Sequence, residues 1–376
     1  MRKGIIMTAQ KQRQSNIELF RIITMLLIVA HHYVVNSGLM ELIGSQPFCA
    51  KSLFYYVFGA WGKAGINGFV LITGYFMCRS EISVRKFLKL YLEVLFYRLG
   101  IYILFSALGM DAFSLKRVLL TALPFTSLAD NFTGCFLAFY LLIPFLNLAL
   151  THLSRKAHLC LILLLLLFYT ILGTVPSFEV RFSYVSWFVV IYLIGAYIRF
   201  YDPKALHHQI GKKLLAAIVL VLGSIVVFAY LKKRFGVESN IVTYFLTEVN
   251  RPFALLTAVL AFSYFRQLKI GYHAWINTIA ASTFGVFLIH TSGSTMRSWL
   301  WGSLLHSKQM YDVPYGVLLS LVSVLGVFLV CSVIDILRTR LLERPFFRFY
   351  DRHEKRIIPN IGEIFSQDAH YVNRGG

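Results

Sequence analysis

The sequence is poor in charged residues: they make up only 14% of its 376 positions, whereas hydrophobic residues make up 57%. A soluble domain of this size needs more charge on its surface, so an ordinary soluble fold is excluded and an integral membrane protein is expected. The formal net charge is nevertheless +20. In a membrane protein such an excess typically reflects basic residues kept on the cytoplasmic side, so we expect lipid and not nucleic acid around this chain.

Cysteine is also scarce, and its placement excludes two kinds of site. The five cysteines are scattered, without the spacing of a disulfide framework or a metal centre. They are Cys49, Cys78, Cys135, Cys160 and Cys331. The histidines at 152, 158, 207 and 208 have no carboxylate or cysteine at ligand spacing, so we expect no metal.

Several familiar motifs are missing as well. No Gly-Lys-Ser phosphate loop and no Gly-x-Ser-x-Gly elbow occurs. We find no internal repeat, which weighs against transporters built from inverted halves. The first residues, MRKGIIMTAQKQRQ, are basic and polar and carry no cleavage pattern, so we expect a cytoplasmic lead-in over 1–16.

Long apolar runs are what the sequence does contain. A transmembrane helix needs about 20 such residues. Ten segments qualify: 17–37, 53–77, 87–109, 132–152, 157–176, 183–201, 212–231, 252–268, 276–300 and 315–340. Gly, Ser, Thr or charged residues interrupt the second, eighth and ninth. We therefore expect an all-α integral membrane protein, a bundle of about ten transmembrane helices, with an amphipathic surface helix over 239–250.

The distribution of basic residues predicts the orientation. With ten spans both termini lie on one side, and if that side is the cytoplasm, the inside segments hold 24 of the 37 Lys and Arg residues while the outside loops hold 10. This asymmetry indicates cytoplasmic termini, although Lys232-Lys233-Arg234 runs against it. The chain then forms a single domain over 1–376, with the bundle at 17–340 and a basic cytoplasmic tail at 341–376.

The first span, ELFRIITMLLIVAHHY, carries ionisable residues that lipid does not tolerate. At 100° per residue, Glu18, Arg21 and His32 fall close to one line, with Arg21 and His32 about 16 Å apart along the axis. His31 lies off that line and has no assigned role. A structural Glu–Arg pair and a hydrogen-bonded histidine would explain the stripe, but a histidine near mid-membrane also suits a general base or proton relay.

This stripe resembles the first span of the membrane acyltransferase-3 superfamily, multi-pass proteins that O-acylate cell-surface carbohydrates. There an acidic residue, two positions, an arginine, ten positions and a histidine recur, as Glu18, Arg21 and His32 do here. The resemblance implies that His32 is the base or accepts the acyl group itself. It also implies that Arg21 orients the coenzyme A end or stabilises charge, and that Glu18 holds Arg21.

Two further segments fit the same family. The run GINGFVLITGYFM (65–77) resembles its second-span block, with Thr73 and Tyr75 flanking a glycine, and Asn67 offers a buried amide that, with Lys63, suits a polar cavity. The run STFGVFLIHTSG (282–293) resembles its aromatic-rich histidine element, which places His290 near mid-depth. We expect Asn67, Thr73, Tyr75 and His290 to bind substrate, although packing or a structural hydrogen bond would also account for each.

Basic residues precede the third span, where the family holds a basic pair thought to receive the phosphates of acyl-CoA. Here the pair is Lys86 and Lys89, with Arg85 adjacent, and lysine lacks the bidentate fork of the arginines usual at this place. An ordinary positive-inside anchor would place basic residues here too. Three later segments also resemble family blocks, namely FYLLIPFLN (139–147), WFVVIYLIGAYIR (187–199) and LLERPFFRF (341–349). Packing roles are expected for the first two, and a salt bridge to the tail for Glu343.

The resemblance implies an O-acyltransferase of the bacterial cytoplasmic membrane. It would transfer an acyl group, expected to be acetyl, from cytoplasmic acetyl-CoA or another acyl-CoA to a hydroxyl of a surface polysaccharide or its lipid-linked precursor. A transporter or flippase for a lipid-linked oligosaccharide, with His32 as proton relay, is the main alternative. A multi-pass glycan polymerase is a second, disfavoured because the external loops are short. The sequence says nothing about oligomeric state.

Overall fold

The computed structural model describes residues 13–125, 131–236 and 239–353, and these are almost entirely helical. The long helices are α1 (Ser15–Val35), α5 (Val84–Ala107), α7 (Phe132–His152), α8 (Arg155–Leu166, extended by a π-helical turn Leu167–Leu172), α9 (Tyr184–Tyr201), α10 (Ile210–Phe235) and α15 (Gly316–Arg338, followed by a π turn Thr339–Glu343 and α16, Arg344–His353). The shorter ones are α2 (Leu39–Ser45), α3 (Ala50–Ala60), α4 (Gly62–Met77), α6 (Leu115–Ala122), α11 (Pro252–Gln267), α12 (Ala274–Ala281), α13 (Thr283–His290) and α14 (Gly293–Arg297).

Every predicted span contains helix. Judged by length and composition, however, fewer than ten helices can cross a membrane. Within the described residues seven helices are long and apolar enough, or eight if the broken pair Ala274–His290 and Gly293–Tyr311, bent by 104°, is one span. The segments that fall short or bend are the second, eighth and ninth, the three that polar residues interrupt. The protein is therefore a multi-pass membrane protein, and the count of ten stays a prediction.

The segment predicted as a surface helix is not one. Ser239–Thr243 forms a short 3-10 turn and the following residues form turns. Val242, Leu246 and Val249 are almost completely buried, so their spacing reflects packing into the bundle and not an amphipathic surface. The amphipathic pattern was misleading because a tightly turned loop can also bury apolar residues at the spacing that is typical of one face of a helix.

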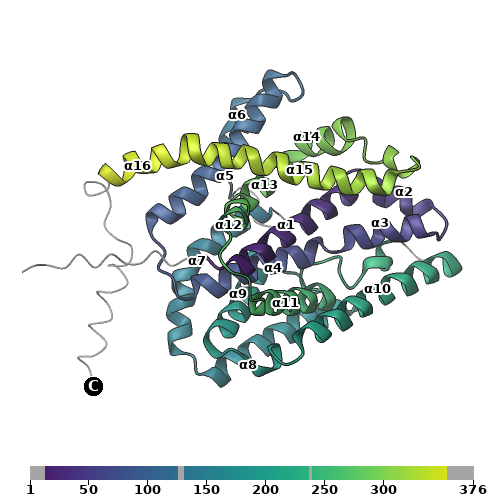
Figure 1. The fold of residues 1–376 in the computed structure, drawn as a ribbon, viewed down its shortest axis with the longest axis horizontal. Helices are drawn as coiled ribbons and strands as arrows, with labels where there is room; N and C mark the ends of the chain where they lie inside the picture. Colours follow the sequence, from purple (N-terminus) through teal and green to yellow (C-terminus); the bar gives the residue numbers. More distant parts are fainter. Residues whose placement is uncertain (1–12, 126–130, 237–238, 354–376) are drawn as a thin grey trace, which may run out of the picture.

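The middle of the bundle is formed by α1 and α4, with α9 and α11 packed against α4. Figure 1 shows α15 and α16 as one long rod along one edge, α10 along the opposite edge, and α6 projecting from the bundle. Side-chain caps fix where several helices begin: Ser83 accepts from the amide of Lys86, and Ser183 from that of Ser186.

Glycines set the distance between α4 and α9. A Cβ atom on Gly74 would lie 2.8 Å from the carbonyl oxygen of Tyr192, and one on Gly195 would lie 2.8 Å from the carbonyl oxygen of Leu71. Backbone atoms cannot yield as a flexible side chain can, so only glycine permits this approach. The packing role expected for Gly195 is thus what the structure gives it.

Substituting Gly195 by alanine is expected to destabilise the bundle. The added methyl group overpacks a backbone contact, at a cost of about 1–3 kcal/mol in the free energy of unfolding. Gly223→Ala on α10 is the matched control, because a Cβ there meets nothing within 4 Å. Thermal unfolding of the two detergent-solubilised variants should show a lowered midpoint for the first alone, and equal midpoints would contradict this account of the packing.

Candidate active site

Two histidines from distant parts of the chain meet at the end of α1. His32 lies in the last turn of α1 and His290 is the last residue of α13, and 2.9 Å separates His32 Nδ1 from His290 Nε2. Phe287 packs against both rings, with centroids 6.3 Å from His32 and 6.0 Å from His290. His32 lines a cavity, whereas His290 is fully buried and does not line it.

The hydrogen bonds determine how the protons are arranged when both rings are neutral. His290 Nδ1 lies 2.6 Å from the carbonyl oxygen of Val286, which can only accept, so this nitrogen carries the proton. His290 Nε2 is then an acceptor, and His32 Nδ1 must donate to it. The remaining nitrogen, His32 Nε2, keeps its lone pair. The pair therefore presents a base whose tautomer is fixed by its neighbour.

The cavity in front of His32 has a volume of about 450 Å³. We call it the His32 cavity, and its polar and charged lining includes His31, His32, Lys63, Arg98, Asn131, Thr133, Tyr184, Thr291, Ser292 and Arg297. Lys63 donates to the hydroxyl of Tyr184 at 3.2 Å. The buried lysine singled out in the second span thus lines a polar cavity, as its position in an apolar run suggested.

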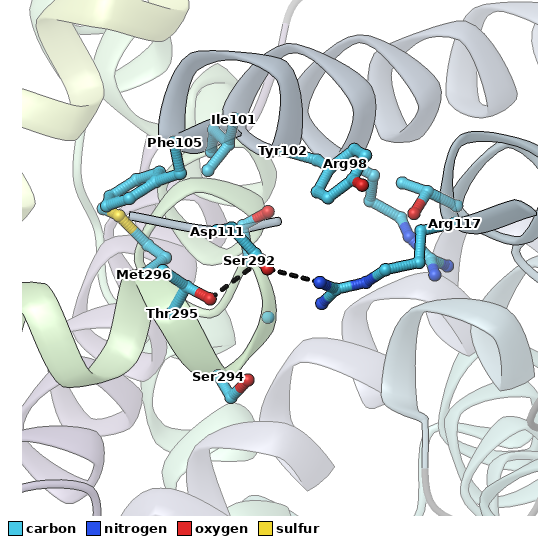
Figure 2. Close-up of a pocket in the computed structure, with 12 residues that line it drawn as sticks. Arg98, Ile101, Tyr102, Phe105, Asp111, Arg117, Ser292, Ser294, Thr295 and Met296 are labelled. Carbon is cyan, nitrogen blue, oxygen red and sulfur yellow. Dashed lines mark hydrogen bonds and ion pairs between the residues drawn. The ribbon is translucent and has the colours of Figure 1, made fainter. Parts of the chain in front are cut away.

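A smaller cavity of about 190 Å³ adjoins it, here called the Asp111 cavity. The two share Arg98, Ser292 and Gly293. Figure 2 shows Asp111 between Arg117 and Thr295, whose hydroxyl lies 3.0 Å from the carboxylate. The hydrogen bond from Arg117 lowers the pKa of Asp111 below its ordinary value, so this carboxylate is charged and already occupied.

His31, which had no assigned role, holds two helices together. Its Nδ1 lies 2.6 Å from the carbonyl oxygen of Gly59, in the last turn of α3, where helix carbonyls lack intrahelical partners. Gly62 makes room for the ring, since a Cβ there would lie 2.3 Å from it. His31 thus fixes the break between α3 and α4 and borders the His32 cavity.

The other predicted catalytic residues lie at the opposite end of α1. Glu18 and Arg21 form the expected ion pair, with 3.3 Å between Glu18 Oε2 and Arg21 Nε, and the guanidinium of Arg21 packs over Phe69. Arg21 does not line the His32 cavity. The shared line on the helix was right, but His32 is about 26 Å along the axis from Ser15, so it lies at the far end of α1 and not halfway. His290, likewise predicted at mid-depth, lies at that end too, before the bend after α13.

Three residues predicted to bind substrate lie elsewhere. Asn67 is fully buried, donating to the carbonyl of Val249 at 2.7 Å and accepting from the indole of Trp187 at 2.8 Å, which gives it a structural role. The Thr73 hydroxyl bonds back to its own helix at Phe69. These two residues and Tyr75 do not line the His32 cavity, because only the first turns of α4 reach it.

Tyr75 lines one of two cavities at the start of α1. These have volumes of about 330 and 490 Å³ and share Arg13 and Tyr272, so we call them the Arg13 cavities. Their basic lining residues are Arg13, Lys89, His207, Arg266, Arg338, Arg340 and Arg344. No lining residue is common to the Arg13 cavities and the His32 cavity.

The predicted phosphate-binding residues are largely occupied. Arg85 forms a bidentate pair with Asp351, at 2.6 and 2.8 Å. The Lys86 ammonium donates to Ser80 and to the carbonyl of Glu81. Of the three basic residues, only Lys89 lines a cavity. Lys89 places these basic residues at the same end of the bundle as the Arg13 cavities, and their role in binding phosphate stays a prediction.

A buried ionic cluster that the sequence did not reveal borders the Arg13 cavities. Arg338 is ion-paired with Glu93 at 3.2 Å, with Asp335 at 2.9 Å and with Glu343 at 3.0 Å, and Lys89 completes the cluster at 2.7 Å from Glu343. It ties α5 to the end of α15. Glu343 does form salt bridges, as expected, and those within the described residues run to α5 and α15. Asp335 and Arg338, three residues apart in an apolar run, were the overlooked signal.

Apolar helices thus surround a polar cavity lined by His32, whose tautomer His290 fixes. Residues 14–334 match the model of acyltransferase family 3, described as an acyltransferase domain. The match covers most of the chain, so the protein belongs to this family and is a membrane acyltransferase. No curated protein and no solved structure matches it.

Proposed function

We propose that this protein transfers an acyl group, acetyl in the simplest case, from cytoplasmic acyl-CoA to a hydroxyl of an exported glycan or its lipid-linked precursor. Its place would be the bacterial cytoplasmic membrane. One observation carries the proposal: His290 fixes the ring of His32 through Nδ1, which leaves the Nε2 lone pair of His32 available at a polar cavity. Acyl transfer to an alcohol needs such a base.

In the proposed reaction His32 Nε2 takes the proton of the acceptor hydroxyl as its oxygen attacks the thioester carbonyl. A carbon–oxygen bond forms, the carbon–sulfur bond breaks, and the imidazolium returns its proton to the departing thiolate. The charge that develops on the carbonyl oxygen needs a donor, and the ammonium of Lys63 in the His32 cavity supplies one. His290 accepts the Nδ1 proton throughout and keeps the ring oriented.

The donor's nucleotide would occupy the Arg13 cavities. Arginines bind phosphate oxygens in a bidentate manner. Within the described residues, Arg13 and Arg344 form no hydrogen bond to an acidic side chain, although Arg13 approaches Glu18 at 3.9 Å. Tyr272, shared by both cavities, offers a ring for a base to stack on. The pantetheine arm of the coenzyme, with the acyl group at its end, would then run along α1. The start of α1 borders these cavities and its end carries His32.

Replacing Arg13 or Arg344 by alanine is expected to raise the KM for acetyl-CoA about tenfold, with little change in kcat, because a phosphate contact is lost from ground state and transition state alike. Arg348→Ala, exposed on the same helix α16 as Arg344 but outside the cavities, is the matched control. Steady-state kinetics on solubilised protein measure both constants. An unchanged KM in both cavity variants would place the nucleotide elsewhere.

The overall activity is tested with radiolabelled acetyl-CoA. Membranes containing the protein are incubated with the label and with glycan from the host, beside membranes containing His32→Ala. We expect label in the glycan with the wild-type protein alone. Equal labelling in both samples, or none in either, would refute the proposed reaction, and export of a lipid-linked oligosaccharide without labelling would support a transporter instead.

A further inference from the structure

The cavities around His32 carry more positive charge than the proposed reaction uses, since it employs only Lys63. Of the residues that line the His32 and Asp111 cavities, four are permanently basic: Lys63, Arg98, Arg117 and Arg297. Asp111 is the single carboxylate among these lining residues. It is occupied by Arg117 and the hydroxyl of Thr295, so it neutralises none of the other three (Figure 2).

Arg98 is the most informative of these residues. It lies on α5 and lines both cavities, and its Nη1 atom is buried without a hydrogen-bond partner. No ion pair to Arg98 is found within the part of the chain that the structure describes. A buried guanidinium nitrogen without a partner is costly, and a bound ligand or ion would satisfy it.

Arg297 faces the same space from the other side of the bend after α13. It lines the His32 cavity from the end of α14 and has no ion-pair partner within the described residues. His32 lines the same cavity, so the two residues face a common space. Lys63 differs, since it donates to Tyr184 and lies 4.0 Å from Glu248. Among the described residues, Arg98 and Arg297 are therefore the two cations of this cavity that have no ion-pair partner.

We propose that the acceptor is an acidic glycan whose carboxylate or phosphate is bound by Arg98 and Arg297 while a neighbouring hydroxyl reaches His32 Nε2. Arginine suits both oxyanions, because its planar fork donates two parallel hydrogen bonds. The charge belongs to the acceptor and not to the acyl-CoA, because the basic residues suited to the nucleotide line separate cavities at the start of α1. This inference deepens the proposed function and rests on it.

Binding to the solubilised protein tests the inference without requiring turnover. The probes are an oligosaccharide containing glucuronic acid, its carboxyl-reduced neutral form, and the neutral form bearing one phosphate. We expect one or both acidic probes to bind at least about tenfold more tightly than the neutral one. His32→Ala should keep this preference. A wild-type protein that binds the acidic probes selectively but transfers no acyl group would refute the proposed reaction and leave the acidic site standing.

The variants Arg98→Gln and Arg297→Gln are each expected to lose most of the preference, whereas Arg98→Lys should retain part of it because the charge is kept. Arg181→Gln, 93% exposed in its side chain on a loop, is the matched control and should behave as the wild type. Size-exclusion chromatography confirms that each variant is folded. The inference is overturned if the wild type binds all three probes equally or binds none, or if Arg98→Gln and Arg297→Gln both keep the preference. It is also overturned if the charge requirement lies in the acyl chain, shown by a neutral acceptor that is modified with succinyl-CoA and not with acetyl-CoA.

Discussion

His32→Ala is expected to lower kcat by about a hundred- to ten-thousand-fold, the range typical for loss of a general base. The ring is half-buried and its Nδ1 is held by His290, so the substitution removes one reactive nitrogen and little packing. The KM for acetyl-CoA should change little, because the Arg13 cavities share no lining residue with the His32 cavity.

The matched control for this substitution is His152→Ala, an exposed histidine at the end of α7. Initial rates at saturating acetyl-CoA, measured for both variants at equal amounts of folded protein, make the comparison. A His32 variant that is as active as the control would show that His32 takes no part in the chemistry. The contact of His32 with His290 would then only hold α1 and α13 together.

His290→Ala is expected to lower kcat about a hundredfold without removing the base itself. Without the acceptor Nε2, the Nδ1 proton of His32 is unpaired in a cavity, and the ring loses both its tautomer and its orientation. His290→Gln should recover part of the rate, because its side-chain oxygen can accept from His32 Nδ1. In both variants the KM for acetyl-CoA should remain that of the wild type.

A spectroscopic measurement separates this positioning role from a merely structural one. In protein labelled with ¹⁵N-histidine, the wild type should show His32 with a protonated Nδ1 and an unprotonated Nε2, and His290→Ala should shift His32 toward a mixture of tautomers. Equal losses of kcat in the alanine and glutamine variants, with the tautomer unchanged, would contradict the role assigned to His290.

Much of the fold could be predicted from the sequence because lipid imposes a simple rule. A span must be apolar and about 20 residues long, and each of the ten runs that satisfy this contains helix. The rule says less about interrupted runs. The break at Trp61, between α3 and α4, and the bend after His290 depend on tertiary contacts such as that of His31 with Gly59.

The site was predicted in part, and the reason is geometric. Helical periodicity relates residues of one helix, so it correctly paired Glu18 with Arg21. It gives no information about which residues of different helices meet, and His32 with His290, or Arg338 with Glu93, are contacts of that kind. Arg98 and Lys63 carried a recognisable signal, a permanent charge inside an apolar run, and both line the His32 cavity.

In the proposed reaction, donor and acceptor approach from opposite sides of the membrane, because the two sets of cavities lie at opposite ends of α1. Sealed proteoliposomes test this directly, with an acidic acceptor enclosed and radiolabelled acetyl-CoA added outside. Those molecules whose donor side faces outward should label the enclosed acceptor, while acceptor and donor placed together outside intact vesicles should give no product. Labelling that occurs only when both substrates share one side would contradict transfer through the bundle.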